Sequence, residues 1–261
     1  MLHMDRRRNR YLWLTVLLII IAGGVYCAQR LIGNSEALWR NVSLECVPHQ
    51  RQQGQPAPCS EVNIDSDYVI YKDLKGGLQF LLMPIAKISG IESPVLLAEQ
   101  TPNYFYQSWQ ARHYLADKRG AAIADRSLSL TVNSELGRTQ NHLHVHISCL
   151  RPDVRQQIDN DTTRLGNGWQ PLPTPLRGHP YLARRVTAQA LAAKSPFRML
   201  AEEVPDAGSQ MGHYGLALVP ASDGSFILLA LRRNLMRFNL ASTEEIQDHS
   251  CAILDTAVNR L

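Results

Sequence analysis

The chain has 261 residues, of which 45% are hydrophobic and 19% are charged, and its formal net charge at pH 7 is +4. This length allows one sizeable hydrophobic core or two small domains. Four arginines and one aspartate in the first ten residues account for +3 of the +4, so the rest of the chain lacks the basic surface that nucleic-acid-binding proteins need.

The N-terminal residues have the pattern of a membrane anchor. Residues 11–28 carry no charge, and as a helix they would span about 27 Å, close to the hydrocarbon thickness of a bilayer. Because arginines precede this stretch, we expect residues 1–10 to be a cytoplasmic basic flank, 11–28 a transmembrane helix, and the remainder exported. A cleaved signal peptide and a lipidated Cys27 are the alternatives. The segment GVYCAQRL, however, has no A-x-A-like cleavage site and no small residue before the cysteine.

Four further cysteines, Cys46, Cys59, Cys149 and Cys251, lie in the part expected to be exported. An even number of cysteines in an oxidising compartment indicates disulfides, and four cysteines allow three pairings. We favour a local Cys46–Cys59 bridge and a long-range Cys149–Cys251 bridge, with unpaired buried thiols as the alternative. A zinc site fits these cysteines less well, because the chain has no C-x-x-C pair.

The first elements of the expected exported part are a helix, a hairpin and a second helix. Apolar residues at helical spacing predict a helix over 35–46, and the Pro/Gln-rich segment after it reads as a loop. Two β-rich runs at 68–71 and 78–83, separated by a pair of glycines, predict a hairpin. The apolar period over 103–118 predicts another helix, which Gly120 ends.

A second pair of strands and further helical pattern follow. Apolar residues alternate with polar ones over 128–132, which predicts a strand. The turn NSELG returns this strand into a second one, which carries three histidines. Residues 187–203 have a helical pattern that breaks near Pro196.

The C-terminal part predicts a hairpin and a last helix. Two apolar runs flank the turn at 222–224, and Ser242 with Glu245 forms a capping box that would open a helix. Together these elements predict an α+β fold with an antiparallel sheet and packed helices, preceded by one N-terminal transmembrane helix. Residues 35–261 are expected to form a single domain.

The most distinctive motif is HLHVHI, in which His142, His144 and His146 alternate with Leu143 and Val145. On a strand the three histidines would share one face, about 6.6 Å apart in succession. One interpretation is a metal site, because neutral imidazole is a common zinc ligand. A second is nucleophilic catalysis, in which an imidazole attacks phosphorus and water opens the phosphoramidate. A third is a chance cluster on the surface.

The motif and its flanks resemble the histidine-triad signature of nucleotide hydrolases and transferases. Members of that family often have a Gly and then a Ser or Thr before the first histidine, and an Asn at the end of the preceding strand. This chain has Gly137, Thr139 and Asn133 in those places. Gln140 and Asn141 depart from the apolar or aromatic residues that are more usual at their positions.

A closer resemblance is to the bacterial CDP-diacylglycerol pyrophosphatases. It is carried by the basic N-terminal anchor, the spaced cysteines and the segments NHLHVHISCLRPDVR, LRGHPYLARRV and FRMLAEEVP. The likeness spans nearly all of the chain from about residue 37 onward. It implies a histidine-triad (HIT-like) catalytic domain in the periplasm, held at the inner membrane by a single-pass anchor.

The resemblance also implies a reaction and roles for the residues. CDP-diacylglycerol would be hydrolysed to CMP and phosphatidate, with no cofactor and no metal. His144 would attack the phosphorus on the CMP side and carry a transient cytidylyl group. His142 would orient and polarise His144, and His146 would contact the phosphate oxygens or the leaving oxygen. Asn133 and Thr139 would hydrogen-bond phosphate or ribose.

Arg138 is a further candidate from the residues themselves, because an arginine fork matches phosphate geometry, although a solvated turn residue fits equally well. The carboxylates within reach of the triad in sequence are Asp125 and Asp153, which do not form a cluster. Two other functions stay open. The domain can be a metal-dependent periplasmic hydrolase, or an anchored module that binds a nucleotide or lipid without chemistry.

Overall fold

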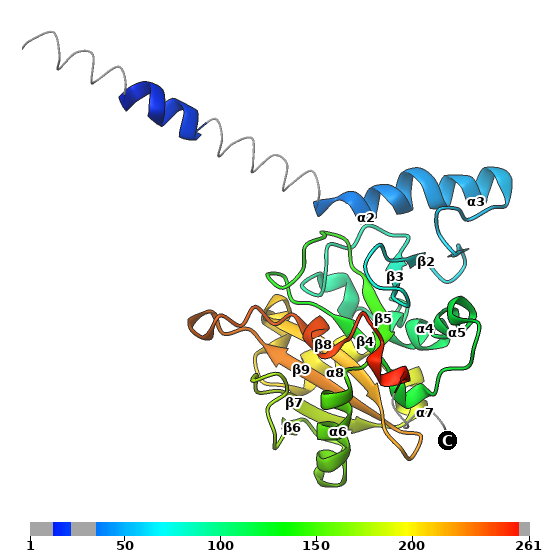
Figure 1. Ribbon diagram of the computed structural model, residues 1–261, viewed down its shortest axis with the longest axis vertical. Helices are drawn as coiled ribbons and strands as arrows, with labels where there is room; N and C mark the ends of the chain where they lie inside the picture. The colour runs from blue at the N-terminus through cyan, green and yellow to red at the C-terminus, as the bar shows by residue number, and fades with distance from the viewer. Residues whose placement is uncertain (1–12, 22–34, 256–261) are drawn as a thin grey trace, which may run out of the picture.

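The computed structural model describes residues 13–21 and 35–255 of the chain. Residues 35–255 build a nine-stranded sheet with the strand order β1-β2-β3-β5-β4-β8-β9-β7-β6, and all its neighbouring strands are antiparallel (Figure 1). The strands are β1 (Glu61–Asn63), β2 (Tyr68–Lys72), β3 (Phe80–Pro84), β4 (Leu128–Val132), β5 (Val145–Cys149), β6 (Gln170–Pro171), β7 (Leu182–Val186), β8 (Tyr214–Pro220) and β9 (Phe226–Arg232). The hairpins β2–β3 and β8–β9 are those that the sequence predicts, whereas β1, β6 and β7 were not predicted.

The sheet consists of two halves with the same topology. In the first half the strands lie in the order β2-β3-β5-β4, and in the second half in the order β6-β7-β9-β8. In each half, two helices connect the second strand along the chain to the third. The halves meet where β4 pairs with β8, with Thr131 opposite Ala217. The four connecting helices are α4 (Tyr104–Gln110), α5 (His113–Arg119), α7 (Ala188–Ala193) and α8 (Pro196–Glu203).

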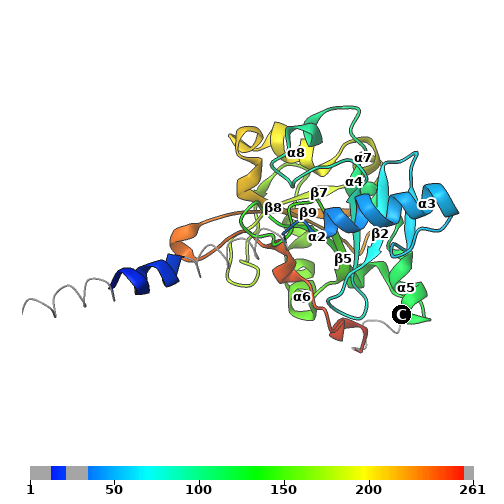
Figure 2. The ribbon, with the colours of Figure 1, turned by 90° about the horizontal axis from the view of Figure 1, so that it is seen from above.

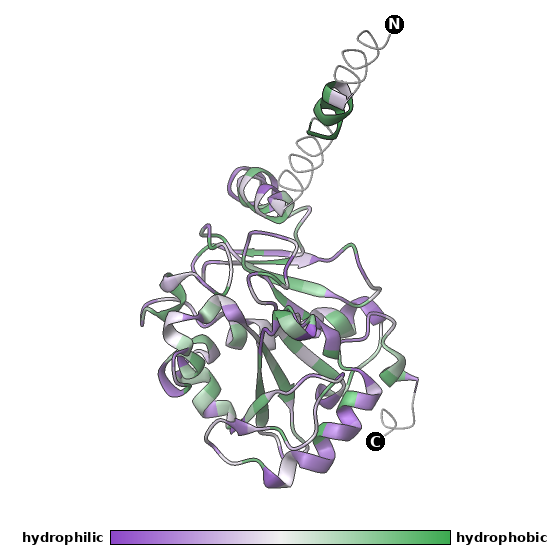
Figure 3. Cartoon of the chain, turned by 90° about the vertical axis from the view of Figure 1, so that its left-hand side faces the viewer, coloured by the Kyte–Doolittle hydropathy of each residue, from purple (hydrophilic) through white to green (hydrophobic). Residues whose placement is uncertain are grey.

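The two faces of the sheet are covered differently (Figure 2). One face holds the larger core, in which Leu130, Ile147 and Leu228 pack with residues of α4, α5, α7 and α8. On the other face, α6 (Pro152–Asp161) packs over Ile227 and Leu229 of β9. Figure 3 shows that the strands are mostly hydrophobic, while α6 carries many hydrophilic residues.

The first helical segment covers the β2–β3 end of that second face (Figure 1). The sequence predicted a loop from residue 47, which was wrong, because the helix continues to Gln53. Pro48 is tolerated because it lies in the first turn of the continuation, and the widened turns of a π-helix come directly before it. We call this segment the leading helix; it consists of α2 (Ala37–Arg40), η1 (Asn41–Cys46) and α3 (Val47–Gln53).

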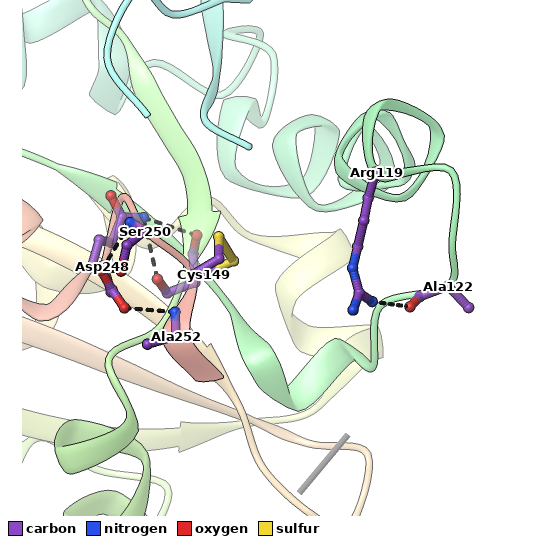
Figure 4. Close-up of a disulfide and its surroundings, with 9 residues drawn as sticks. Arg119, Ala122, Cys149, Asp248, Ser250 and Ala252 are labelled. Carbon is purple, nitrogen blue, oxygen red and sulfur yellow. Dashed lines mark hydrogen bonds between the residues drawn. A yellow bond between two sulfur atoms is a disulfide. The ribbon is translucent and has the colours of Figure 1, made fainter. Parts of the chain in front are cut away.

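Two disulfides tie the ends of the described domain to the sheet. Cys46 is bonded to Cys59 and Cys149 to Cys251, in the pairing favoured from the sequence. The first bridge holds the leading helix, and the second holds the C-terminal segment to the end of β5. Figure 4 shows how Asp248 shapes the turn at this second bridge. Its backbone N–H donates to the carbonyl of Cys149 at 2.9 Å, and its carboxylate accepts the N–H groups of the residues on either side of Cys251.

The final helix predicted from Ser242 onward is not formed. The segment contains only short 3₁₀ turns, Thr243–Ile246 and Ala252–Leu254, and Ser242 makes no side-chain cap. The two capping-box side chains have tertiary partners instead. Ser242 Oγ donates to Asn133 Oδ1 at 3.2 Å, and Glu245 lies 2.8 Å from His179. A local signal is overridden here because distant groups compete for the same side chains.

The predicted transmembrane helix over residues 11–28 is also wrong. Residues 13–21 are helical, but among the described residues no helix is both long and apolar enough to cross a membrane. A helix over that stretch spans about 14 Å, less than half of a bilayer's hydrocarbon thickness. The predicted basic flank, residues 1–10, lies outside the described residues. The same is true of positions 11–12 and 22–28 of the predicted span, which include Cys27.

Candidate active site

The three histidines lie at the beginning of β5. The sequence analysis placed all three on one strand, but β5 begins at Val145, so only His146 belongs to it. His142 and His144 precede the strand, because β3 pairs with β5 only from Val145 onward and β4 only from His146 onward. The connection from β4 is therefore longer than the tight NSELG turn that was predicted, and it runs over residues 133–144.

His144 is held in one tautomer by the backbone. Its Nδ1 lies 2.6 Å from the carbonyl oxygen of His142, and since a carbonyl only accepts, the ring proton is on Nδ1. The other nitrogen, Nε2, has no hydrogen-bond partner in the described part of the chain, and His144 lines a pocket. Burial, together with nearby His146, lowers the pKa of His144 to about 3. At neutral pH His144 is therefore an uncharged imidazole with a lone pair on Nε2.

His142 is fully buried behind the pocket. Its Nε2 donates to the carbonyl of Pro84 at 2.9 Å, and its ring lies 5.1 Å from the ring of Trp39 on the leading helix. Burial lowers its pKa to about 4. The ring of His142 is thus part of the packing between the leading helix and the sheet, and the contact with His144 is made by its backbone carbonyl.

His146 is held in the opposite tautomer. The Gln79 amide donates to its Nδ1 at 3.1 Å, and the same amide nitrogen lies 2.6 Å from the carboxylate of Asp73. The ring proton is therefore on Nε2, which lies 3.6 Å from Glu244. Burial lowers the pKa of His146, although Glu244 acts in the other direction. The ring centroids of His144 and His146 lie 4.8 Å apart in an edge-to-face arrangement. His144 presents a lone pair on Nε2, and His146 presents an N–H.

Glu244 is the main residue that sequence reasoning missed. Its Oε2 also lies 3.3 Å from Asn133 Nδ2, and its Oε1 lies 3.2 Å from His249 Nε2. Burial raises the pKa of Glu244, but His146 and the hydrogen bond from Asn133 outweigh that effect, so the pKa lies below its ordinary value. Glu244 is 111 residues beyond Asn133, in a segment whose only local signal was a helix cap, so no motif marks it.

A pocket of about 440 Å³ opens beside His144 and His146. Glu244 and the loop after β2 form part of its lining. The backbone N–H of Leu38 in the leading helix donates to Gln140 Oε1 at 3.1 Å. This hydrogen bond joins the leading helix to the β4–β5 connection. The other lining residues come from the leading helix, from β2 and β3, and from the β4–β5 connection, namely Ala37, Asn41, Tyr71, Leu81, Asn133, Gly137 and Thr139.

The candidate phosphate ligands differ in their positions. Asn133 and Thr139 line the pocket. Arg138 does not, because its guanidinium binds both carboxylate oxygens of Glu92, at 2.6 and 2.8 Å, and its side chain is nearly buried. Lys75 is the cation that lines the pocket, and it forms no ion pair with any residue that the structure describes.

The second half of the sheet has no comparable site. Thr131 pairs with His146 on one side and with Ala217 on the other, and Ala217 in turn pairs with Leu229 of β9. Leu229 therefore occupies the position that His146 has in the first half, and Ile227 corresponds to His144. Both are packed under α6. The duplicated topology thus carries imidazoles in one half and core residues in the other.

The carboxylates near the triad in space are not those that are near in sequence. Asp125 pairs with Arg112 and Asp153 with Arg151, away from the pocket. Asp73 and Glu244 line the pocket instead. Within residues 13–21 and 35–255, no group of three or more His, Cys, Asp or Glu side chains is arranged to hold a metal ion.

In a comparison with protein families, a family model described as CDP-diacylglycerol pyrophosphatase matches residues 33–255, which is well over half of the chain and includes the whole sheet and the pocket.

Proposed function

The chain belongs to the CDP-diacylglycerol pyrophosphatase family, and from this premise we propose how its histidines carry out the reaction. The enzyme is a hydrolase that cleaves the pyrophosphate of CDP-diacylglycerol. We propose that the cleavage passes through a covalent intermediate on His144. The observation that carries this proposal is the hydrogen bond from His144 Nδ1 to the carbonyl of His142, which leaves a lone pair on Nε2 toward the pocket.

In the first step, His144 Nε2 attacks the phosphorus of the CMP moiety. A P–N bond forms, the bond between this phosphorus and the bridging oxygen breaks, and phosphatidate leaves with the bridging oxygen and the electron pair. In the second step, water attacks the same phosphorus, the P–N bond breaks, and CMP is released with His144 neutral again. The low pKa of His144 keeps the attacking nitrogen unprotonated at neutral pH, which this mechanism needs.

His146 is suited to stabilise the charge that develops during both steps. Its Nε2–H points toward the pocket side that Glu244 occupies, and it can donate to a phosphate oxygen or to the leaving oxygen. The Glu244 carboxylate stabilises the proton on His146 Nε2. The same carboxylate is proposed to accept a proton from the attacking water. Asn133 and Thr139 are proposed to hydrogen-bond phosphate or ribose, and Lys75 to pair with phosphate.

We further propose that the site is of the histidine-triad type. The H-x-H-x-H spacing, Asn133 at the end of β4 and Thr139 before the first histidine support this. The two disulfides favour an oxidising compartment, for which the bacterial periplasm is our proposal.

The test is to trap the intermediate. The full chain in mixed micelles is given CDP-diacylglycerol with a labelled cytidylyl phosphorus, with EDTA present, and quenched early in turnover. We expect an acid-labile label on the wild-type protein, and none on His144→Ala. The matched control is His113→Ala, which removes an exposed histidine on α5 that pairs with Asp117 and does not line the pocket, and this variant should label normally.

Two results would contradict the mechanism. Turnover without any protein-bound label under rapid quench would indicate direct attack by water. Activity that EDTA abolishes and a divalent cation restores would instead support histidines that act as metal ligands.

A further inference from the structure

The loop that follows β9 exposes an unusual set of apolar side chains. Met236 and Phe238 are 94% and 93% exposed, and Leu235 and Leu240 are also exposed. In Figure 1 this loop, coloured orange to brown, projects well beyond the sheet. Apolar residues at a projecting tip are a liability in water unless something covers them.

The tip is presented on a firm base. The backbone of Asn234 bonds to that of Asn239 in both directions, at 2.8 and 3.0 Å, which closes the loop. Asn239 is itself nearly buried, and its side chain bonds to the backbone of Arg232 and Ala241. The apolar tip is therefore a formed structure and does not depend on a partner to fold.

Phe238 has a backbone φ of 54°, in the left-handed region that favours glycine or asparagine. A bulky aromatic residue is disfavoured there, and in this fold its ring gains no packing in return. The position would be more stable with a small residue as far as folding is concerned. The presence of a phenylalanine at this position points to a use for the ring outside the folded chain.

A cationic pocket lies at the base of the same loop. It has a volume of about 310 Å³, and Arg232, Arg233, Arg237 and His179 contribute to its lining. Arg232 bonds to a neutral glutamine, and Arg237 forms no ion pair among the residues that the structure describes. Arg233 contacts His213 and forms a long ion pair with Glu135 at 4.0 Å. Arg232 and Arg237 therefore have no carboxylate partner among the described residues, and their charges suit phosphate groups.

We propose that the 233–240 loop docks onto an anionic phospholipid surface. Met236 and Phe238 would enter the acyl region while the three arginines bind lipid phosphates at the level of the headgroups. Charge complementarity selects lipid over a protein partner, because an apolar tip surrounded by cations matches the cross-section of an anionic bilayer. The proposal rests on the lipid substrate of the family and is independent of the histidine mechanism.

The loop is also joined directly to the catalytic pocket. The chain returns from the tip into Leu240 and Ala241, whose carbonyls accept hydrogen bonds from Ser134, and reaches Glu244 within the next turn. Ser134 belongs to the connection that supplies Asn133 to the pocket. A docked loop would therefore hold the pocket close to the surface that contains the substrate.

The first experiment compares two forms of substrate. The full chain is assayed on long-chain CDP-diacylglycerol in vesicles of phosphatidylcholine and phosphatidylglycerol, and on a short-chain CDP-diacylglycerol dissolved as a monomer. We expect the double variant Met236→Ser/Phe238→Ser to lose about tenfold or more in kcat/KM on vesicles. On the dissolved substrate it should keep its activity, which also shows that it folds. Val95→Ser, which replaces an exposed apolar residue elsewhere, should change neither.

The second experiment observes the loop directly. The fluorescence of Phe238→Trp, measured as the difference from wild type, should shift to the blue on vesicles and be quenched by brominated lipid. When Arg237→Gln is combined with Phe238→Trp, the blue shift and the quenching should be weaker. The loss should be largest on vesicles that contain phosphatidylglycerol.

Three outcomes overturn the proposal. The first is that the double variant has the same activity on vesicles as the wild type. The second is that the double variant loses equal activity on vesicles and on the dissolved substrate. The third is that the double variant abolishes self-association of the protein but keeps its activity on vesicles. His144→Ala should lose activity on vesicles and on the dissolved substrate. If Phe238→Trp in the same chain still shows its fluorescence response to vesicles, docking is separate from the catalytic mechanism.

Discussion

His144 Nδ1 donates to the carbonyl oxygen of His142 at 2.6 Å, so the first two histidines are connected through the backbone of the first and not through its ring. The ring of His142 instead packs against Trp39. The side chains of these neighbouring histidines are therefore expected to contribute separately, that of His144 to the proposed chemistry and that of His142 to packing.

Substitution of the two histidines should separate these contributions. His144→Ala should lower kcat by at least about 10⁴-fold, because it removes the proposed nucleophile. His142→Ala keeps the carbonyl, so its kcat should fall far less, while the lost buried ring lowers the free energy of unfolding by about 3 kcal/mol. Steady-state kinetics and thermal denaturation of both variants check this. Equal losses of kcat would show that the His142 ring takes part in the reaction.

Glu244 offers a test with its sequence neighbour as the control. Glu244→Gln should lower kcat by about 10²-fold, because it removes the carboxylate beside His146 Nε2. Glu245→Gln should leave kcat nearly unchanged, because Glu245 bonds to His179 and Tyr181 outside the pocket. If the two variants had the same activity, Glu244 would have no part in turnover.

The stability of the enzyme should depend on pH through its buried histidines. The pKa values of His144 and His142 are lowered to about 3 and about 4 from 6.5, so the unfolded chain binds more protons between these values. Their contribution to the free energy of unfolding is complete above about pH 6.5 and is lost as the pH falls through 6.5 toward 4. Wild-type Tm should therefore fall across this interval, and that of His144→Asn should fall less steeply. Parallel Tm curves for the two proteins would be inconsistent with a buried neutral His144.

Gly137 should tolerate no side chain. A Cβ there would lie 3.0 Å from both the carbonyl oxygen of Ala241 and the backbone nitrogen of Ser242. Gly137→Ala should therefore displace the segment that carries Glu244 and cost about 1–3 kcal/mol of stability, with a loss of activity. Gly168→Ala, where a Cβ meets nothing within 4 Å, is the matched control and should behave as wild type. Denaturant unfolding and activity assays of both variants decide the matter.

The Cys46–Cys59 disulfide should matter for substrate binding. It closes a separation of 13 residues, and its loss should cost about 3 kcal/mol by the loop-entropy estimate. Because the bridge holds the leading helix that lines the pocket, Cys46→Ala/Cys59→Ala should raise KM more than it lowers kcat. Steady-state kinetics of this variant, measured below its lowered Tm, test this expectation. A lower kcat with unchanged KM would mean that the leading helix is not part of the binding site.

The amino-acid sequence alone was enough to predict the hairpins, the split helix around Pro196 and the histidine motif of the candidate site. Runs of apolar, β-prone residues on either side of turn residues are a local signal, so β2, β3, β8 and β9 could be predicted without knowledge of their partners. The histidine motif and the family resemblance also pointed to His144, His146, Asn133 and Thr139, which line one pocket. The disulfide pairing was one of three that the cysteines allow, and the structure confirms the favoured one.

Only the tertiary structure decided which groups surround the histidines. Gln79 and Glu244 set the tautomer of His146, yet they are 165 residues apart and have no motif of their own. The capping box at Ser242 failed because Asn133 and His179 compete for its two side chains. Strand pairing also placed His142 and His144 ahead of β5. Local periodicity determines which segments can form elements, but hydrogen bonds between distant segments determine which atoms meet, and these depend on the complete fold.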